Sequence, residues 1–206
     1  MSTSQAASAA HTNGANIGLM HIRSATTDDF DTILALNHES VVFLSPLDAQ
    51  RLAMLHGLAA WHRVVEDDDG RVIAFLLALR EGAAYDSINY GWFTGRYQRF
   101  LYVDRVVVAR ASKARGAASR LYRELFRFAA ANQLPSVVCE VDIEPPNPDS
   151  LRFHQRFGFS EVGRQWVAGN TKQVAFQVAP VEHSQGDGYQ CASNRLEIGC
   201  AIVRSR

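Results

Sequence analysis

The feature that most constrains the fold of this chain is an apolar, strand-like run that passes directly into a helix. Residues 100–109 are strand-like, and residues 115–132 carry apolar side chains at helical spacing: Leu121, Leu125, Phe128 and Ala129. Positions i, i+4, i+7 and i+8 share one face of a helix. A strand joined by a short turn to an amphipathic helix favours an α/β fold.

The rest of the chain has the same mixture of strand and helix patterns. Residues 63–65 and 71–79 flank an Asp-Gly turn at 67–70, which predicts a β-hairpin. Helices are predicted to begin at Thr26 and at Ser45, where capping residues precede acids. Further strands are expected over residues 22–25, 136–142, 161–166 and 174–178.

The domain boundaries follow from composition. Residues 1–20 are rich in Ser, Ala, Asn and Gly, so we expect a disordered extension that lacks the features of a signal peptide. One domain is expected over residues 21–180, with a long loop at 81–99. Residues 181–206 show no clear period, and the sequence leaves their structure open.

The charge balance and the cysteines limit the classes of function. The chain has 21 basic and 21 acidic residues, so no net field favours nucleic acid or an anionic membrane. Its 3 widely spaced cysteines form neither a disulfide framework nor a Cys-x-x-Cys metal pair. The longest apolar stretches have the length of strands. We therefore expect a cytoplasmic protein without metal, and with neither a nucleic-acid nor a membrane partner.

The turn over residues 113–119 has the composition of an anion-binding site. Its backbone N–H groups lie at a helix N-terminus, where they and the helix dipole favour a pyrophosphate. Small residues let phosphates approach the main chain closely. Positive charge is supplied by Lys113, Arg115 and Arg120. The alternative is an ordinary strand-to-helix turn with solvated basic residues.

A second segment, residues 147–159, predicts a short helix with polar residues on one face. Asn147 caps this helix, and Gly158 ends it before a strand. Ser150 and His154 are four residues apart and share a face. A surface or packed histidine is the ordinary interpretation of His154, and a catalytic histidine is the alternative.

Together these segments resemble the GNAT (GCN5-related N-acetyltransferase) family over residues 21–180. The family's phosphate loop, Gln/Arg-x-x-Gly-x-Gly/Ala, is matched by Lys113, Ala114, Arg115, Gly116, Ala117 and Ala118. Its second signature, Asn-x-x-Ala-x-x-aromatic-Tyr followed by Gly-Phe, is matched by Asn147, Ser150, Phe153, His154, Gly158 and Phe159. Lysine opens the phosphate loop and keeps its charge, whereas His154 replaces the expected tyrosine.

The resemblance implies a mixed sheet of about six to seven strands, splayed between its central strands and flanked by about four helices. Acetyl-CoA is the implied cosubstrate, and no metal is implied. Its pantetheine arm would pair with the backbone of Val106, Val107 and Val108. The backbone from Lys113 to Ser119 would hold the pyrophosphate. Asn147 would lie near the pantetheine arm or the adjoining helix start, and Ser150, from the same signature, would also border the cofactor.

Transfer of an acetyl group to an amine needs a base, a donor for the oxyanion and an acid for sulfur. The resemblance places a backbone N–H near Val106 at the oxyanion and His154 at the acid position. Glu140 is the preferred base, because burial in an apolar strand would raise its pKa. Asp104 is the second candidate, and even spacing predicts that it shares a face with Val106 and Val108. Ordinary ion pairs with basic neighbours are the alternative for both acids.

The sequence thus predicts an enzyme that moves an acetyl group from acetyl-CoA to a primary amine, directly and in a ternary complex. Residues 85–97, rich in aromatic side chains, are the predicted acceptor wall, and packing or a homodimer contact is the alternative. The competing class is a non-catalytic acyl-CoA-binding regulatory module. A nucleic-acid binder is disfavoured by the zero net charge. The acceptor, a small molecule or a peptide amine, is not identified by the sequence.

Overall fold

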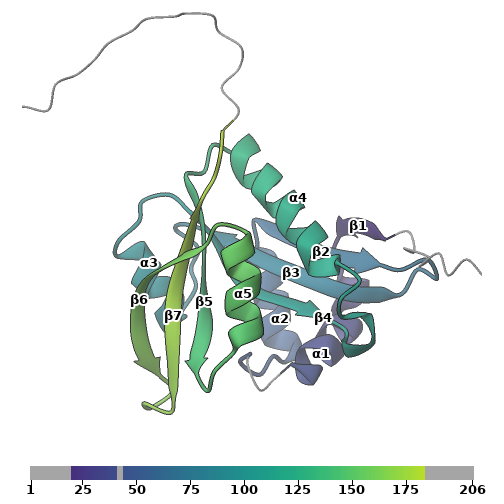
Figure 1. The fold of residues 1–206 in the computed structure, drawn as a ribbon. Helices are drawn as coiled ribbons and strands as arrows, with labels where there is room; N and C mark the ends of the chain where they lie inside the picture. Colours follow the sequence, from purple (N-terminus) through teal and green to yellow (C-terminus); the bar gives the residue numbers. More distant parts are fainter. Residues whose placement is uncertain (1–19, 41–43, 184–206) are drawn as a thin grey trace, which may run out of the picture.

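The computed structural model describes residues 20–40 and 44–183, which contain one seven-stranded mixed sheet (Figure 1). The strand order is β1-β2-β3-β4-β5-β7-β6, and every neighbouring pair is antiparallel except β4 and β5, which are parallel. The predicted α/β fold is confirmed. The strands are β1 His21–Ser24, β2 Trp61–Glu66, β3 Val72–Arg80, β4 Leu101–Val108, β5 Ser136–Glu144, β6 Ser160–Val167 and β7 Lys172–Pro180.

Helices cover both faces of this sheet. On one face α4 and α5 enclose the largest apolar cluster, whereas α1 and α2 pack on the opposite face against β3 (Figure 1). The described residues form five α-helices, one more than the resemblance implies. They are α1 Phe30–Glu39, α2 Ala49–Leu58, α3 Ile88–Thr94, α4 Ala117–Ala131 and α5 Pro148–Arg156.

Two local predictions about helices were wrong. The expected loop at 81–99 contains α3, which Ser87 caps by accepting a hydrogen bond from the backbone N–H of Tyr90. This helix has only 7 residues, too few for a helical period to be recognised in the sequence. The second helix is capped by Asp48 rather than Ser45, since the Asp48 carboxylate accepts from the Arg51 N–H at 2.7 Å.

The sheet is splayed at its centre. The parallel strands β4 and β5 pair only at Leu101–Val137 and Tyr102–Val138. Beyond these pairs the strands separate, and in Figure 1 β1 to β4 run in a different direction from β5 to β7. The splayed sheet that the resemblance implies is therefore present, and its open part begins at Val103.

Hydrogen bonds attach residues near both ends of the described range to the rest of the domain. Met20, placed in the extension by the sequence, is buried, and its carbonyl accepts a hydrogen bond from Arg120 at 2.7 Å. At the other end the Val181 N–H donates to the Pro135 carbonyl at 3.0 Å. The predictions for residues 1–19 and 184–206 lie outside the described residues. Within 20–40 and 44–183, no helix is long and apolar enough to cross a membrane.

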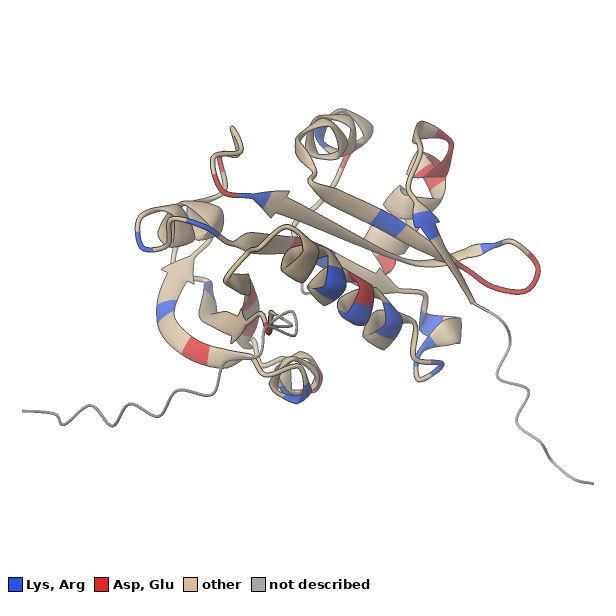
Figure 2. Cartoon of the chain, turned by 90° about the horizontal axis from the view of Figure 1, so that it is seen from above, with Lys and Arg blue, Asp and Glu red and all other residues tan. Residues whose placement is uncertain are grey.

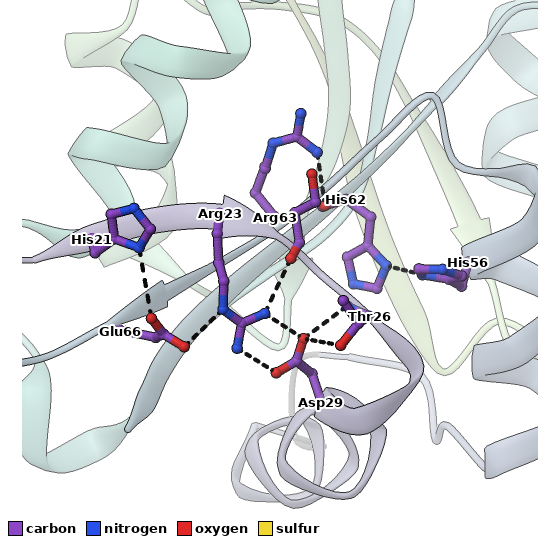
Figure 3. Close-up of polar contacts among 9 residues, drawn as sticks. His21, Arg23, Thr26, Asp29, His56, His62, Arg63 and Glu66 are labelled. Carbon is purple, nitrogen blue, oxygen red and sulfur yellow. Dashed lines mark hydrogen bonds and ion pairs between the residues drawn. The ribbon is translucent and has the colours of Figure 1, made fainter. Parts of the chain in front are cut away.

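Charges of both signs are spread over the domain. Figure 2 shows basic residues along α4 and acidic residues in the turn between β2 and β3. Near β1, Arg23 joins Asp29 and Glu66 through hydrogen bonds of 2.7 Å (Figure 3). This bridge ties the start of α1 to the first two strands and lowers the pKa of Asp29 to about 2, chiefly through the hydrogen bond from Arg23.

Behind that bridge lies a buried histidine on β2. The His62 ring is 5% exposed and packs edge-on against Phe75, and its Nδ1 lies 3.0 Å from Nδ1 of His56 (Figure 3). At most one of the two facing nitrogens carries a proton in this contact. Burial first, and then the neighbouring His56, lower the pKa of His62 to about 4. His62 is therefore neutral in the folded protein at pH 7.

This histidine makes stability depend on pH. Below about pH 6.5 His62 becomes protonated in the unfolded chain but stays neutral in the folded protein. The free energy of unfolding therefore falls as the pH decreases from 6.5 to 4. At about 1.4 kcal/mol for each pKa unit, His62 accounts for roughly 3 kcal/mol of that loss. Urea unfolding of His62→Gln should show a flatter pH dependence than wild type. The matched variant of an exposed histidine, His38→Gln, should keep the wild-type slope, and equal slopes in all three proteins would contradict the assignment.

Candidate active site

The split between β4 and β5 opens into a cavity of about 970 Å³. Its wall is formed by both strands together with the first turn of α4, the helix α5 and the start of α3. All but two of the predicted site residues line it. They are Asp104, Val106, Val107, Val108, Lys113, Ala114, Gly116, Ala118, Ser119, Glu140, Asn147, Ser150 and His154. Of the other two, Arg115 is exposed to solvent, and the side chain of Ala117 is buried in the core.

The first turn of α4 has a backbone geometry that could accept an anion. Gly116 is the N-cap residue with φ +86°, and Ala114 also has a positive φ of +69°. Such left-handed residues turn successive N–H groups toward one concave side, and the first four N–H groups of a helix lack intrahelical acceptors. A Cβ added at Gly116 would meet nothing within 4 Å, so the glycine is required by its backbone angle.

One basic residue assigned to this turn points elsewhere. The Arg120 guanidinium donates to the Met20 carbonyl and lines a separate groove beside β1 and β2. Arg120 therefore anchors the first strand to α4 and does not add charge to the cavity. Lys113 is the basic residue of the turn that lines the cavity.

The open edge of β4 offers main-chain groups to the cavity. The Ala109 N–H donates to the Ile73 carbonyl at 2.8 Å, which directs it toward β3. Successive residues of a strand alternate in direction, so the N–H groups of Val106 and Val108 point away from β3. Since β5 has already diverged, these groups face the split rather than another strand.

Asp104 does not share a face with Val106 and Val108, contrary to the even-spacing prediction. The register shifts within β4, because Leu77 pairs with Arg105 while Ala78 pairs with Val103. Asp104 is thus the extra residue of a β-bulge, which changes the alternation of side chains along the strand. The two valines pack toward the α4 side, whereas Asp104 contacts Tyr85 on the opposite side.

Both oxygens of the Asp104 carboxylate are already engaged. Oδ1 accepts from the Tyr85 hydroxyl at 2.5 Å, and Oδ2 accepts from Arg105 Nε at 2.6 Å. Arg105 also donates to Asn37 on α1 at 2.9 Å, and the Asp104 and Arg105 side chains are 3% and 5% exposed. Burial and the Asp104 carboxylate raise the pKa of Tyr85. This network matches the ion-pair alternative for Asp104, because a fully bonded carboxylate has little capacity to accept another proton.

Glu140 differs from Asp104 because one of its carboxylate oxygens has no hydrogen-bond donor among the described residues. Oε1 accepts from Asn89 Nδ2 at 2.9 Å and from the Tyr102 hydroxyl at 3.0 Å. Oε2 has no hydrogen-bond partner among the described residues. The pKa of Glu140 is raised to about 7, chiefly by burial; the hydrogen bonds from Asn89 and Tyr102 oppose the rise, and the nearby Asp104 charge adds to it. The carboxyl can therefore take up and release a proton near neutral pH.

His154 is held at both ring nitrogens. Its Nδ1 lies 2.8 Å from the Ser150 carbonyl, and its Nε2 lies 2.7 Å from the Tyr122 hydroxyl. A carbonyl only accepts, so Nδ1 carries the proton and Nε2 of the neutral ring accepts from Tyr122. Burial lowers the pKa of His154, which favours this neutral form. The backbone that holds Nδ1 belongs to the capped start of α5, where Asn147 accepts from the Ser150 N–H at 3.2 Å.

Besides Tyr102, which donates to Glu140, two further residues of the cavity make contacts with the candidate catalytic groups that the sequence did not predict. Asn89 lies in the segment expected to be a loop, and no pattern there distinguishes it from its polar neighbours. Tyr122 follows Leu121 in the apolar stripe of α4, so it has the sequence signature of a core residue. Both are brought to the site by contacts between segments far apart in the chain, which composition and spacing do not reveal.

A split mixed sheet, a helix N-terminal turn with left-handed residues and a buried titratable acid thus meet in one cavity of this α/β domain. The sequence model of the "Acetyltransferase (GNAT) family" matches residues 29–159, more than half of the chain. The chain therefore belongs to the GNAT acetyltransferase family. No curated protein matches the sequence.

Solved structures with the same fold include enzymes from bacteria and plants. The ribosomal-protein-S18-alanine N-acetyltransferase of Escherichia coli aligns over 84% of this chain and 100% of its own, with 12% identity and a TM-score of 0.62. Arabidopsis thaliana NAA60, in complex with a bisubstrate analogue, aligns over 81% and 100%, with 17% identity and a TM-score of 0.63. A Sinorhizobium meliloti phosphinothricin acetyltransferase in complex with AcCoA aligns over 79% and 88%, with 19% identity and a TM-score of 0.59. At these identities the likeness shows the fold.

Proposed function

We propose that this chain is an N-acetyltransferase that moves the acetyl group of acetyl-CoA to a primary amine, directly and in a ternary complex. The observation that carries the proposal is the buried Glu140 carboxyl, with one free oxygen, in the same cavity as the anion-binding turn of α4. The similar structures support it, since one holds AcCoA and another is named for acetylating an alanine of a ribosomal protein.

The residues present fit the cosubstrate along its length. The pyrophosphate would accept from the N–H groups between Lys113 and Ser119, and Lys113 would supply charge. The pantetheine amides would pair with the outward-facing Val106 C=O and Val108 N–H of β4, which leaves the Val106 N–H for the thioester. Asn147 and Ser150 would border the arm from the α5 side, where both line the cavity. The thioester would then lie near the β4 edge and the α5 wall.

Each chemical demand of the transfer is met by a group of this chain. Glu140 Oε2 accepts a proton from the acceptor ammonium, which frees the nitrogen to attack the thioester carbon. As the C–N bond forms, the Val106 N–H donates to the carbonyl oxygen where negative charge develops. The nitrogen then loses its second proton as the C–S bond breaks. The thiolate takes a proton from the Tyr122 hydroxyl of the Tyr122–His154 pair, the proton lost by the nitrogen restores that hydroxyl, and Glu140 releases the first proton to solvent. The amide, a thiol and one proton are the products.

The acceptor wall is proposed to be the segment at 85–97 that contains α3. Arg51 bonds Asp86 at its edge and lies 5.1 Å from the centre of the Tyr85 ring, so the wall joins charged and aromatic groups. This surface suits a small-molecule or a peptide amine, and packing over the domain or a homodimer contact stays the alternative. A cytoplasmic location also stays a prediction. Release of free thiol from acetyl-CoA with a panel of amines would separate the enzyme from a non-catalytic acyl-CoA-binding module, which releases none.

Cofactor binding is tested at Gly116. Gly116→Glu places a negative charge beside the pyrophosphate and strains the left-handed backbone, so the Kd for acetyl-CoA should rise by more than about tenfold, equal to about 1.4 kcal/mol. Calorimetry measures this change. Gly70→Glu is the matched control, because Gly70 also has a positive φ, of +74°, but lies in the β2–β3 turn away from the cavity. An unchanged Kd in Gly116→Glu would contradict this placement of the cofactor.

The base is tested at Glu140. Glu140→Gln keeps the shape of the side chain and removes its basicity, so kcat should fall by about 10²-fold while calorimetry shows acetyl-CoA binding retained. In wild type, activity should rise with pH through about 7 as the carboxyl loses its proton. This limb should vanish in the variant. Glu144→Gln, at the exposed end of the same strand, should behave as wild type. A wild-type rate in Glu140→Gln would place the base elsewhere.

A further inference from the structure

The helix α3 reaches the active-site cavity through Asn89, and its aromatic residues fix the direction of that side chain. The Tyr90 hydroxyl donates to the Arg80 carbonyl at the end of β3 at 2.7 Å. Trp92 stacks on Phe176 of β7, with ring centres 4.1 Å apart. The helix is therefore attached to strands on both sides of the split.

The Trp92 contact leaves little freedom at the far side of α3. A Cβ added to Gly163 of β6 would lie 2.7 Å from Trp92 Cζ2, which shows that the indole fills the space over that glycine. On the near side Tyr90 is buried between Phe100 and Tyr102. A short helix held in this way presents Asn89, the residue directly before Tyr90, in one direction.

Two donors meet on the same oxygen of Glu140. Asn89 Nδ2 and the Tyr102 hydroxyl donate to Oε1 at 2.9 Å and 3.0 Å, and none of the described residues donates to Oε2. Hydrogen bonds to one carboxylate oxygen stabilise negative charge there. The oxygen without donors is therefore the one at which a proton is taken up.

The orientation of the Asn89 amide follows from the charge of Glu140. Oδ1 of Asn89 is buried and lacks a donor among the described residues, so no second partner selects this orientation. A flipped amide would direct Oδ1 against Oε1, which is repulsive when the carboxyl is ionised. The observed orientation directs Nδ2 to the carboxylate and thus suits its ionised, basic form.

We propose that Asn89 is the positioning residue of the base: its amide holds Oε1 of Glu140, so that the proton of the acceptor amine is received at Oε2. This inference rests on the proposed function, because it assigns Asn89 a role through Glu140. It also gives α3 a second role, since the acceptor wall and the support of the base belong to the same helix. An acceptor that shifts α3 would therefore change the hydrogen bond from Asn89 to Glu140.

The test is the titration of Glu140 in the full chain without substrates. The carboxyl C=O stretch, assigned by subtracting the spectrum of Glu140→Gln, reports its protonation by infrared spectroscopy. Asn89→Leu removes a hydrogen bond that lowers the pKa of Glu140, so the titration should move about one pH unit above the wild-type value of about 7. Thr94→Ala, at the other end of α3, should titrate as wild type. Tyr102→Phe, which keeps the ring, should also shift the titration upward.

The pH dependence of kcat should shift together with the titration of Glu140. An upward shift of about one unit lowers kcat of Asn89→Leu at pH 7 by roughly fivefold, with recovery above about pH 9. If Asn89→Leu unfolds by circular dichroism, the smaller change Asn89→Ser carries the same expectation. An unshifted titration in a folded Asn89 variant overturns the inference. A kcat that stays low at every pH, with the titration unshifted, also overturns it by assigning Asn89 to packing alone.

The same data separate this inference from the proposed function. If Glu140→Gln retains wild-type turnover, the assignment of Glu140 as the base fails, whatever the titration of the Asn89 variants shows, and the positioning role fails with it. If Glu140→Gln is impaired and the Asn89 variants keep the wild-type titration and profile, only the inference about Asn89 fails. Shifted titration together with a shifted profile supports both.

Discussion

The rest of the structure depends on how soon the parallel pairing of β4 and β5 ends. Two residue pairs, ending at Tyr102 and Val138, join the antiparallel halves of the sheet. Had the pairing continued, the outward N–H groups of Val106 and Val108 would bond β5 and no cavity would exist. Because it stops, main-chain donors, the first turn of α4 and the acid of β5 face one space of about 970 Å³. A buried main-chain edge is costly unless something pairs with it, so the split favours an extended ligand.

The two acids beside this split, Asp104 and Glu140, differ in how many of their carboxylate oxygens accept hydrogen bonds. Asp104, displaced by the β-bulge, is bonded at both oxygens by Tyr85 and Arg105 and joins β4 to the face covered by α1. Glu140, two residues beyond the last parallel pair, is bonded at one oxygen only. The paired acid stabilises the site, and the acid with a free oxygen is the one suited to proton transfer. Their proximity also matters, since the charge of Asp104 contributes to the raised pKa of Glu140.

The sequence predicted those features that neighbouring residues determine. Gly116 at the start of α4 and Asn147 at the start of α5 were recognised because caps and turns depend on a few consecutive residues. Glu140 was recognised because a charged residue within an apolar strand is unusual. The bulge at Asp104, the direction of Arg120 and the bond between Tyr122 and His154 depend on the partner strand or helix, so no local pattern contains them. The helix α3 was not predicted for another reason: its 7 residues are too few to show a helical period in the sequence.

The central claim is that the open edge of β4 is the cofactor site, and amide hydrogen exchange followed by NMR tests it most directly. Without ligand, the N–H groups of Val106 and Val108 should exchange faster than that of Ala109, which is bonded to Ile73. Saturating acetyl-CoA should slow exchange at Val106, Val108 and the first turn of α4, while the hairpin of β2 and β3 is unchanged near its turn. Protection confined to other parts of the domain, or none at all with binding confirmed by calorimetry, would contradict the account.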